Sequence, residues 1–197
     1  MPSARLLLIQ VSVIGALGRS LEAQSAQPIS LQASALFNGV FGNVFNALQD
    51  GFGAEAQIRY TPGALSIGAG FQYTEHGLDV RDEKARLYGA FIEPRYRIRT
   101  GSNVVAPYIS TRFSLLKVGF SGGDLSLSSN FIQINGGGGL LYRLGSQLNL
   151  DLGATYGYNR LGRGTLRDRV SGSEEPVEAS SGSNIIVRMG IALGLGG

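Results

Sequence analysis

The chain has 197 residues, which allows one domain of moderate size. Thirty glycines without a collagen period, and no cysteine at all, exclude a collagen-like chain, disulfide bonds and thiolate metal sites. The formal net charge is +3, but no run of lysine or arginine concentrates it, so we expect no nucleic-acid binding.

The first 23 residues have the composition of a secretory signal peptide. Arg5 supplies a positive charge, an apolar segment follows from Leu6 to Leu17, and small residues permit cleavage after Ala23 or Ala26. The apolar segment is shorter than the roughly 20 residues that a membrane-spanning helix requires. We therefore predict a cleaved signal peptide over residues 1–23 and a mature domain over residues 29–197. Export without a later apolar helix leaves two classes, a soluble secreted protein and an outer-membrane barrel.

Eight segments of the mature chain alternate between apolar and polar residues with a period of two, which predicts β-strands. They run from Ser30 to Phe41, Phe52 to Thr61, Leu65 to Thr74, Leu87 to Arg99, Val105 to Val118, Asn130 to Leu144, Gln147 to Asn159 and Asn184 to Leu195. Pro94 in the fourth segment predicts a bulge or a local bend, because proline removes a hydrogen-bond donor from the strand ladder.

The seventh segment, from Gln147 to Asn159, shows the alternation most clearly. Leucines, an alanine and tyrosines occupy its even positions, and polar residues and glycines occupy its odd positions. Strands of soluble proteins usually have about five or six residues, whereas a tilted strand needs about 9–11 to cross a bilayer. The segment predicts a strand with lipid on one face and a barrel lumen on the other. Leu150 and Leu152 should point outward and Asp151 inward.

The connections between the predicted strands alternate in length. Short turns lie near Pro62, Gly101 and Gly145. The longer connections run from Gly42 to Gly51, Glu75 to Arg86, Gly119 to Ser129 and Arg160 to Ser183. Short periplasmic turns and longer external loops are typical of bacterial outer-membrane barrels. In the first long connection, Phe45 and Leu48 allow either an amphipathic turn at the membrane interface or a hairpin extension, and the composition of the last one predicts mobility.

The pattern from Leu31 to Leu195 resembles the small outer-membrane β-barrel proteins of the OmpA/OmpX type. The resemblance implies an all-β fold, an eight-stranded antiparallel up-and-down transmembrane β-barrel. It also implies export through the periplasm, an outer-membrane location and contact with outer-membrane lipid. The C-terminal residues Arg188, Gly190, Leu193 and Leu195 are similar to the terminal signal of this family, which implies recognition by the outer-membrane insertion machinery through the last strand. Family members usually end on an aromatic residue, which this chain does not.

Charged residues recur on the polar faces of the predicted strands. They are Glu55, Arg59, Glu93, Arg95, Arg97, Arg112, Arg143, Asp151 and Arg188. Isolated charges inside a narrow barrel would be costly, so we expect them to pair across strands. The interior of an eight-stranded barrel is just wide enough for side chains to fill. A polar network that closes the lumen is therefore predicted, with a narrow anion-preferring path as the alternative because arginines outnumber carboxylates.

These features predict a membrane-embedded scaffold that presents surface loops for adhesion, interaction or envelope integrity. One alternative is a small passive porin-like channel. Another is a soluble secreted lipocalin-like barrel, which would need its apolar residues inside to bind a small ligand. We predict no enzymatic activity and no cofactor. His76 is the only histidine, and no serine pairs with it convincingly as a nucleophile. A lone histidine cannot form a metal site.

Overall fold

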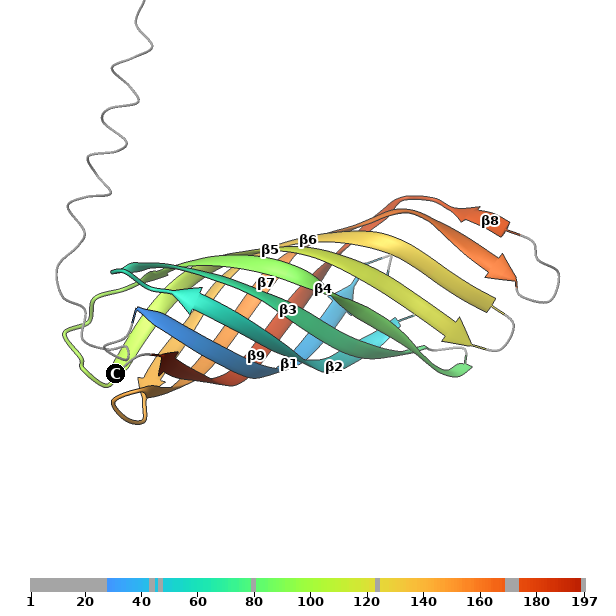
Figure 1. The fold of residues 1–197 in the computed structure, drawn as a ribbon. Helices are drawn as coiled ribbons and strands as arrows, with labels where there is room; N and C mark the ends of the chain where they lie inside the picture. Colours follow the sequence, from blue (N-terminus) through green and yellow to red (C-terminus); the bar gives the residue numbers. More distant parts are fainter. Residues whose placement is uncertain are drawn as a thin grey trace, which may run out of the picture.

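The computed structural model describes residues 28–42, 45, 48–78, 81–122, 125–168 and 174–195. These residues form one antiparallel sheet that closes on itself as an eight-stranded barrel (Figure 1). The predicted signal peptide, residues 1–23, and both predicted cleavage positions lie outside the described residues. Among the described residues, no helix has the length and apolar character needed to span a membrane.

The described part of the chain contains nine strands, eight of which make the barrel wall. The wall strands are β1 (Ile29–Phe41), β2 (Leu48–Tyr60), β3 (Leu65–Leu78), β4 (Arg81–Arg97), β5 (Val105–Gly122), β6 (Leu125–Arg143), β7 (Leu148–Asp168) and β9 (Ser180–Leu195). Each wall strand pairs with the next in antiparallel fashion, and β9 closes the barrel by pairing with both β7 and β1. The short strand β8 (Glu174–Val177) pairs with β7 beyond the wall. The predicted fold class is confirmed.

The strands continue beyond their predicted ends at the end of the barrel opposite the short turns, which we call the hairpin end (Figure 1). The predicted loops Glu75 to Arg86 and Gly119 to Ser129 are mostly paired strand, and Ser129 itself is buried in β6. The last long connection, Arg160 to Ser183, is also largely strand, contrary to the predicted mobile loop. The loop-like composition did not predict these strands, because backbone pairing in a strand ladder does not depend on side-chain polarity.

Pro94 does not create a bulge. It pairs with Ile67 of β3 in regular register. The pairing of β4 with β5 is interrupted between Ile92 and Arg95, but the register is the same on both sides of the interruption. The predicted bulge is therefore wrong, and the alternative of a local bend stays a prediction. The missing amide hydrogen of proline costs a ladder bond on one side of the strand without inserting a residue.

The barrel wall is apolar outside and polar inside, as the alternation predicted. In the seventh predicted strand, now β7, Leu152 is 39% exposed and Asp151 is fully buried, while Leu150 is half-buried. Phe52, Leu115 and Met189 are among the most exposed apolar side chains of the other strands. A soluble ligand-carrying barrel would place such residues inside. The outward apolar face contradicts the lipocalin-like alternative and fits a barrel surrounded by lipid.

Outward tyrosines form two groups along the wall. Tyr60, Tyr96 and Tyr142 lie near the short turns. Tyr73, Tyr88, Tyr156 and Tyr158 lie further along their strands, toward the hairpin end. Tyr88 and Tyr96, one from each group, lie eight positions apart on β4, slightly fewer than the about 9–11 residues that a tilted strand needs to cross a bilayer. The groups correspond to the two aromatic girdles of a transmembrane barrel, and the longest hairpins extend beyond the second girdle.

Candidate functional site

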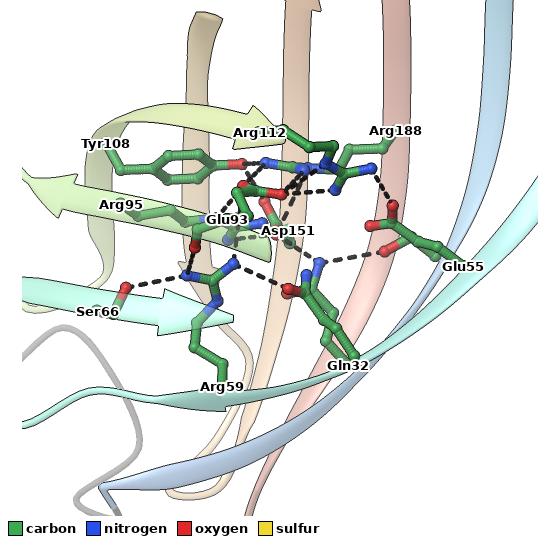
Figure 2. A network of polar contacts seen from close by, with 12 residues as sticks. Gln32, Glu55, Arg59, Ser66, Glu93, Arg95, Tyr108, Arg112, Asp151 and Arg188 are labelled. Atoms are coloured by element: carbon green, nitrogen blue, oxygen red, sulfur yellow. Dashed lines mark hydrogen bonds and ion pairs between the residues drawn. The ribbon is translucent and has the colours of Figure 1, made fainter. Parts of the chain in front are cut away.

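The charged residues on the inner face form one network near the middle of the barrel. Seven of the nine predicted residues take part in it, and each of the seven is buried: Glu55, Arg59, Glu93, Arg95, Arg112, Asp151 and Arg188. They come from β2, β4, β5, β7 and β9, so the network spans the lumen between opposite walls (Figure 2). Period-two alternation on each strand directs these side chains inward.

Glu93 of β4 is the centre of the network. Arg188 of β9 donates to both of its carboxylate oxygens, at 2.6 Å to Oε2 and 2.7 Å to Oε1. Arg95 Nε donates to Oε1 at 2.6 Å, and Arg112 donates to Oε2 through two nitrogens. Arg59 lies 3.7 Å from Oε1. One carboxylate therefore contacts four guanidinium groups, and the two-point contact with Arg188 has the bidentate geometry of strong charge-assisted pairs.

Asp151 of β7 forms the second centre. Its Oδ2 accepts hydrogen bonds from Arg95 at 2.7 Å and from the amide of Gln32 at 2.6 Å. Its Oδ1 accepts a 2.6 Å hydrogen bond from the hydroxyl of Tyr108. Arg95 lies between Asp151 and Glu93 and bonds to both, so it joins the two carboxylates into one network. Asp151 is held on both oxygens, as a buried carboxylate requires.

Glu55 of β2 extends the network toward the hairpin end. Its Oε2 accepts from Arg112 Nη1, whose guanidinium carbon also lies 4.0 Å from the centre of the Phe91 ring. Gln72 accepts a further, longer hydrogen bond from the same Arg112 nitrogen, at 3.3 Å. Arg112 thus has carboxylate, amide and aromatic partners from three other strands. Contacts of this kind fix the orientation of a planar guanidinium group.

Two predicted members lie apart from the network. Arg97 is buried near the short turns, where its Nη2 donates to the backbone carbonyl of Gly63 at 2.5 Å. Arg143 is only half-buried at the same end of the barrel. The sequence placed both residues on inner faces, but it carried no information on height along the barrel. Height separates Arg97 from the carboxylates.

Sequence reasoning missed the neutral members of the network. Arg59 donates to Ser66 Oγ at 3.1 Å and to Gln57 Oε1 at 2.9 Å, and Gln32 reaches Asp151 from β1. Tyr108 bonds to Asp151, accepts a 2.9 Å hydrogen bond from Arg188 and lies 4.4 Å from the Arg95 guanidinium carbon. These residues stood on the polar faces of the predicted strands. The alternation already predicted that these neutral side chains point inward. The charged members were predicted as network residues because their charge requires a partner inside the barrel.

Glycines on the neighbouring strands make room for Tyr108. A Cβ atom added at Gly139 of β6 would lie 2.4 Å from the Tyr108 hydroxyl oxygen, and one added at Gly153 of β7 would lie 2.6 Å from it. Either contact is far closer than real Cβ atoms allow, so a larger residue at these positions would displace the tyrosine. Gly139 and Gly153 are thus strand positions that admit an inward aromatic ring.

We expect Tyr108→Phe to lower the free energy of unfolding by about 1–3 kcal/mol, because Asp151 and Arg188 each lose a buried hydrogen-bond partner. Urea titration of the protein folded into lipid vesicles measures the change. Tyr142→Phe is the matched control, since Tyr142 points outward and has no hydrogen bond to a described residue. Equal effects of the two substitutions would contradict the assigned role of the Tyr108 hydroxyl.

A second, uncharged layer lies above the charged network, toward the hairpin end. Asn135 of β6 donates to Asn184 of β9 at 3.0 Å, and Asn184 donates to Asn38 of β1 at 2.8 Å. The Asn38 amide lies 3.4 Å from Nε2 of His76, which also lies 3.1 Å from Thr74 Oγ1. His76 is fully buried in β3, although the predicted connection from Glu75 to Arg86 included it. An imidazole enclosed in this way has no contact with solvent.

An apolar cluster closes the barrel above the amide layer. Phe45, from the connection between β1 and β2, is 4% exposed and packs against Phe131 with ring centres 5.8 Å apart. The other buried members are Leu87, Leu116, Val118 and Leu161. Phe45 therefore points into the barrel. This inward position does not fit the interfacial turn, one of the two alternatives left open for this connection, because the inner face of the wall becomes apolar at this height and buries the ring.

The C-terminal residues occupy regular positions in β9. Arg188 joins the charged network, and Leu193 and Leu195 point outward. A Cβ atom added at Gly190 would lie 2.2 Å from Ser34 Oγ of the paired strand β1. These placements give the four residues clear structural roles in closing the barrel. Their recognition by insertion machinery stays a prediction.

The arrangement offers charge pairing and steric closure. Within the described residues, no group of three or more histidine, aspartate or glutamate side chains could hold a metal ion. The network contains four arginines and three carboxylates, all buried. Ion pairing, an amide layer and an apolar cluster follow one another along the lumen. The site is best described as a three-layered closure.

The sequence matches no protein-family model and no curated protein. The fold is similar to that of Neisserial surface protein A (TM-score 0.65, 18% identity, covering 85% of this chain and 97% of that chain). It is also similar to OprG of Pseudomonas aeruginosa (TM-score 0.56, 8% identity, 88% and 98% covered). A major outer membrane protein from Thermus thermophilus gives a TM-score of 0.50 at 19% identity, with 84% and 98% covered. The similarities show the fold of small outer-membrane β-barrels, in agreement with the resemblance seen in the sequence.

Proposed function

We propose that this protein is an outer-membrane barrel with a closed lumen, which acts as a scaffold and presents its extended hairpins at the cell surface. The observation that carries the proposal is the closure itself. Glu93 and Asp151 join inward side chains from β1, β2, β4, β5 and β9 across the lumen, all of them buried. A barrel filled in this way supports a structural role better than a transport role.

The hairpin end supports the surface part of the proposal. Hairpins β3–β4, β5–β6 and β7–β9 continue past the second group of outward tyrosines, and β8 adds to the last of them (Figure 1). Exposed charges begin there, as in the cluster of Glu75, Lys84 and Arg86. The opposite end carries short turns and both ends of the described chain. In outer-membrane barrels, the long connections face the exterior and the short turns face the periplasm.

Thiol labelling of intact cells tests the proposal, because the chain has no cysteine of its own. Lys84→Cys introduces a thiol at a residue that is 67% exposed at the hairpin end, and Ser146→Cys introduces one in a short turn. A membrane-impermeant maleimide should label the first variant on intact cells and the second only after the outer membrane is permeabilised. Labelling of Ser146→Cys alone on intact cells would reverse the orientation.

Fractionation of the same cells tests the location. A folded membrane barrel should remain in the outer-membrane fraction and should change its migration on a gel after boiling. Recovery of the chain as soluble protein, without a heat-dependent shift, would overturn the proposed function.

A further inference from the structure

A groove crosses the outer wall of the barrel from β3 to β6. Its volume is about 560 Å³. Phe71, Tyr88, Leu115 and Ile132 supply its apolar lining, and Lys117 and Asn130 supply its polar part. The hollow has a local cause, since the small Ala90 lies in the register between Phe71 and Leu115. The groove thus combines a surface for acyl chains with a cation and an amide.

The polar part of the groove continues into a short row of cations. Lys117 pairs in register with Asn130, and Ile132 pairs with Arg160 of β7. Arg163 follows at a register shift that faces Asn130. Lys117, Arg160 and Arg163 are all exposed, and none has an acidic partner among the described side chains. Lys84 and Arg86, by contrast, are both paired with Glu75. Among the side chains that the structure describes, the row therefore carries positive charge that no carboxylate neutralises.

The position of these cations along the barrel axis indicates which part of the bilayer they face. Lys117 pairs with Tyr88, a member of the aromatic group at the hairpin end, and Arg160 follows two residues after Tyr158 of the same group. Aromatic girdles lie at the level of lipid headgroups. Lysine and arginine side chains at this level can extend toward the interface and meet negatively charged groups.

We propose that the groove binds one phosphorylated lipid of the outer leaflet. Its acyl chains lie against Phe71, Leu115 and Ile132, and its phosphate contacts Lys117 and Arg160. Charge complementarity selects an anionic headgroup, and the apolar lining selects an acylated molecule over free phosphate. The proposal rests on the proposed membrane location, since the groove faces lipid only in an embedded barrel.

Native mass spectrometry of the full chain folded in detergent micelles tests the proposal, with bisphosphorylated lipid A as the probe. Wild-type protein should retain one lipid A molecule per barrel. The double variant Lys117→Gln/Arg160→Gln should bind about 30-fold more weakly, because two charges near the headgroup are removed. The matched control, Lys84→Gln/Arg86→Gln, removes the same number of charges from the cluster paired with Glu75 and should bind like wild type.

Two further controls distinguish binding in the groove from nonspecific electrostatic attraction between lipid A and the protein. Inorganic phosphate should not compete with lipid A for the groove. Lipid A without its two phosphates should bind wild type weakly. Its affinity should match that of intact lipid A for Lys117→Gln/Arg160→Gln. Equal weakening in the two double variants, or equal binding of the dephosphorylated lipid, would overturn the proposed site. Heat-dependent migration of every variant shows that it is folded. A chain that fails the membrane fractionation instead contradicts the proposed function.

Discussion

Replacing Glu93 by glutamine should lower the free energy of unfolding by about 3–5 kcal/mol, the loss expected when one partner of a buried ion pair is removed. Glu93 is fully buried and contacts Arg59, Arg95, Arg112 and Arg188. The substitution leaves an amide where four guanidinium groups meet, and Glu55 and Asp151 remain as the carboxylates of the network. Urea titration of both proteins folded into lipid vesicles measures the difference.

The matched control is Glu75→Gln. Glu75 also contacts two cations, Lys84 and Arg86, but on the exposed surface, where ion pairs contribute little to stability. This control should unfold like wild type. Planar-bilayer recording of wild type adds a second readout, and a closed lumen should give no steady single-channel current. Ohmic currents in wild type, together with unchanged stability of Glu93→Gln, would favour the narrow anion channel over the closed scaffold.

Leu152→Arg should destabilise the folded barrel in a bilayer by about 2–4 kcal/mol. Leu152 points outward from β7 and lies between the start of the strand at Leu148 and the outward Tyr156. This position is near the middle of the apolar band, where an arginine has the longest path to either interface. Equilibrium folding titrations into vesicles of one lipid composition give the value.

Gln147→Arg serves as the control in the same hairpin. Gln147 is exposed in the short turn before β7, where an arginine meets water, so we expect almost no change. Comparable losses for the two substitutions would mean that the outward leucine does not face lipid, and the membrane assignment of β7 would then fail.

The alternation of residue types was sufficient to predict the inner and outer faces of the wall. Asp151 and its neighbouring leucines illustrate this, because side-chain direction in a strand depends only on odd or even position. The ends of the strands were less predictable. Residues around Ser129 have loop-like composition, yet they pair in regular register with β5, and with β7 across a register shift, because backbone hydrogen bonds do not depend on side-chain polarity. Strand length was therefore underestimated at the hairpin end.

Which inward charges meet was decided by tertiary structure alone. The sequence placed Arg97 and Arg188 on inner faces alike, but only Arg188 lies at the height of Glu93, because the register between tilted strands sets height along the barrel. The reach of Tyr108 to Asp151 depends on glycines of two other strands, and the burial of Phe45 depends on apolar residues from four. A local pattern determines the face of each side chain. Only closure of the sheet brings faces that are distant in sequence into contact.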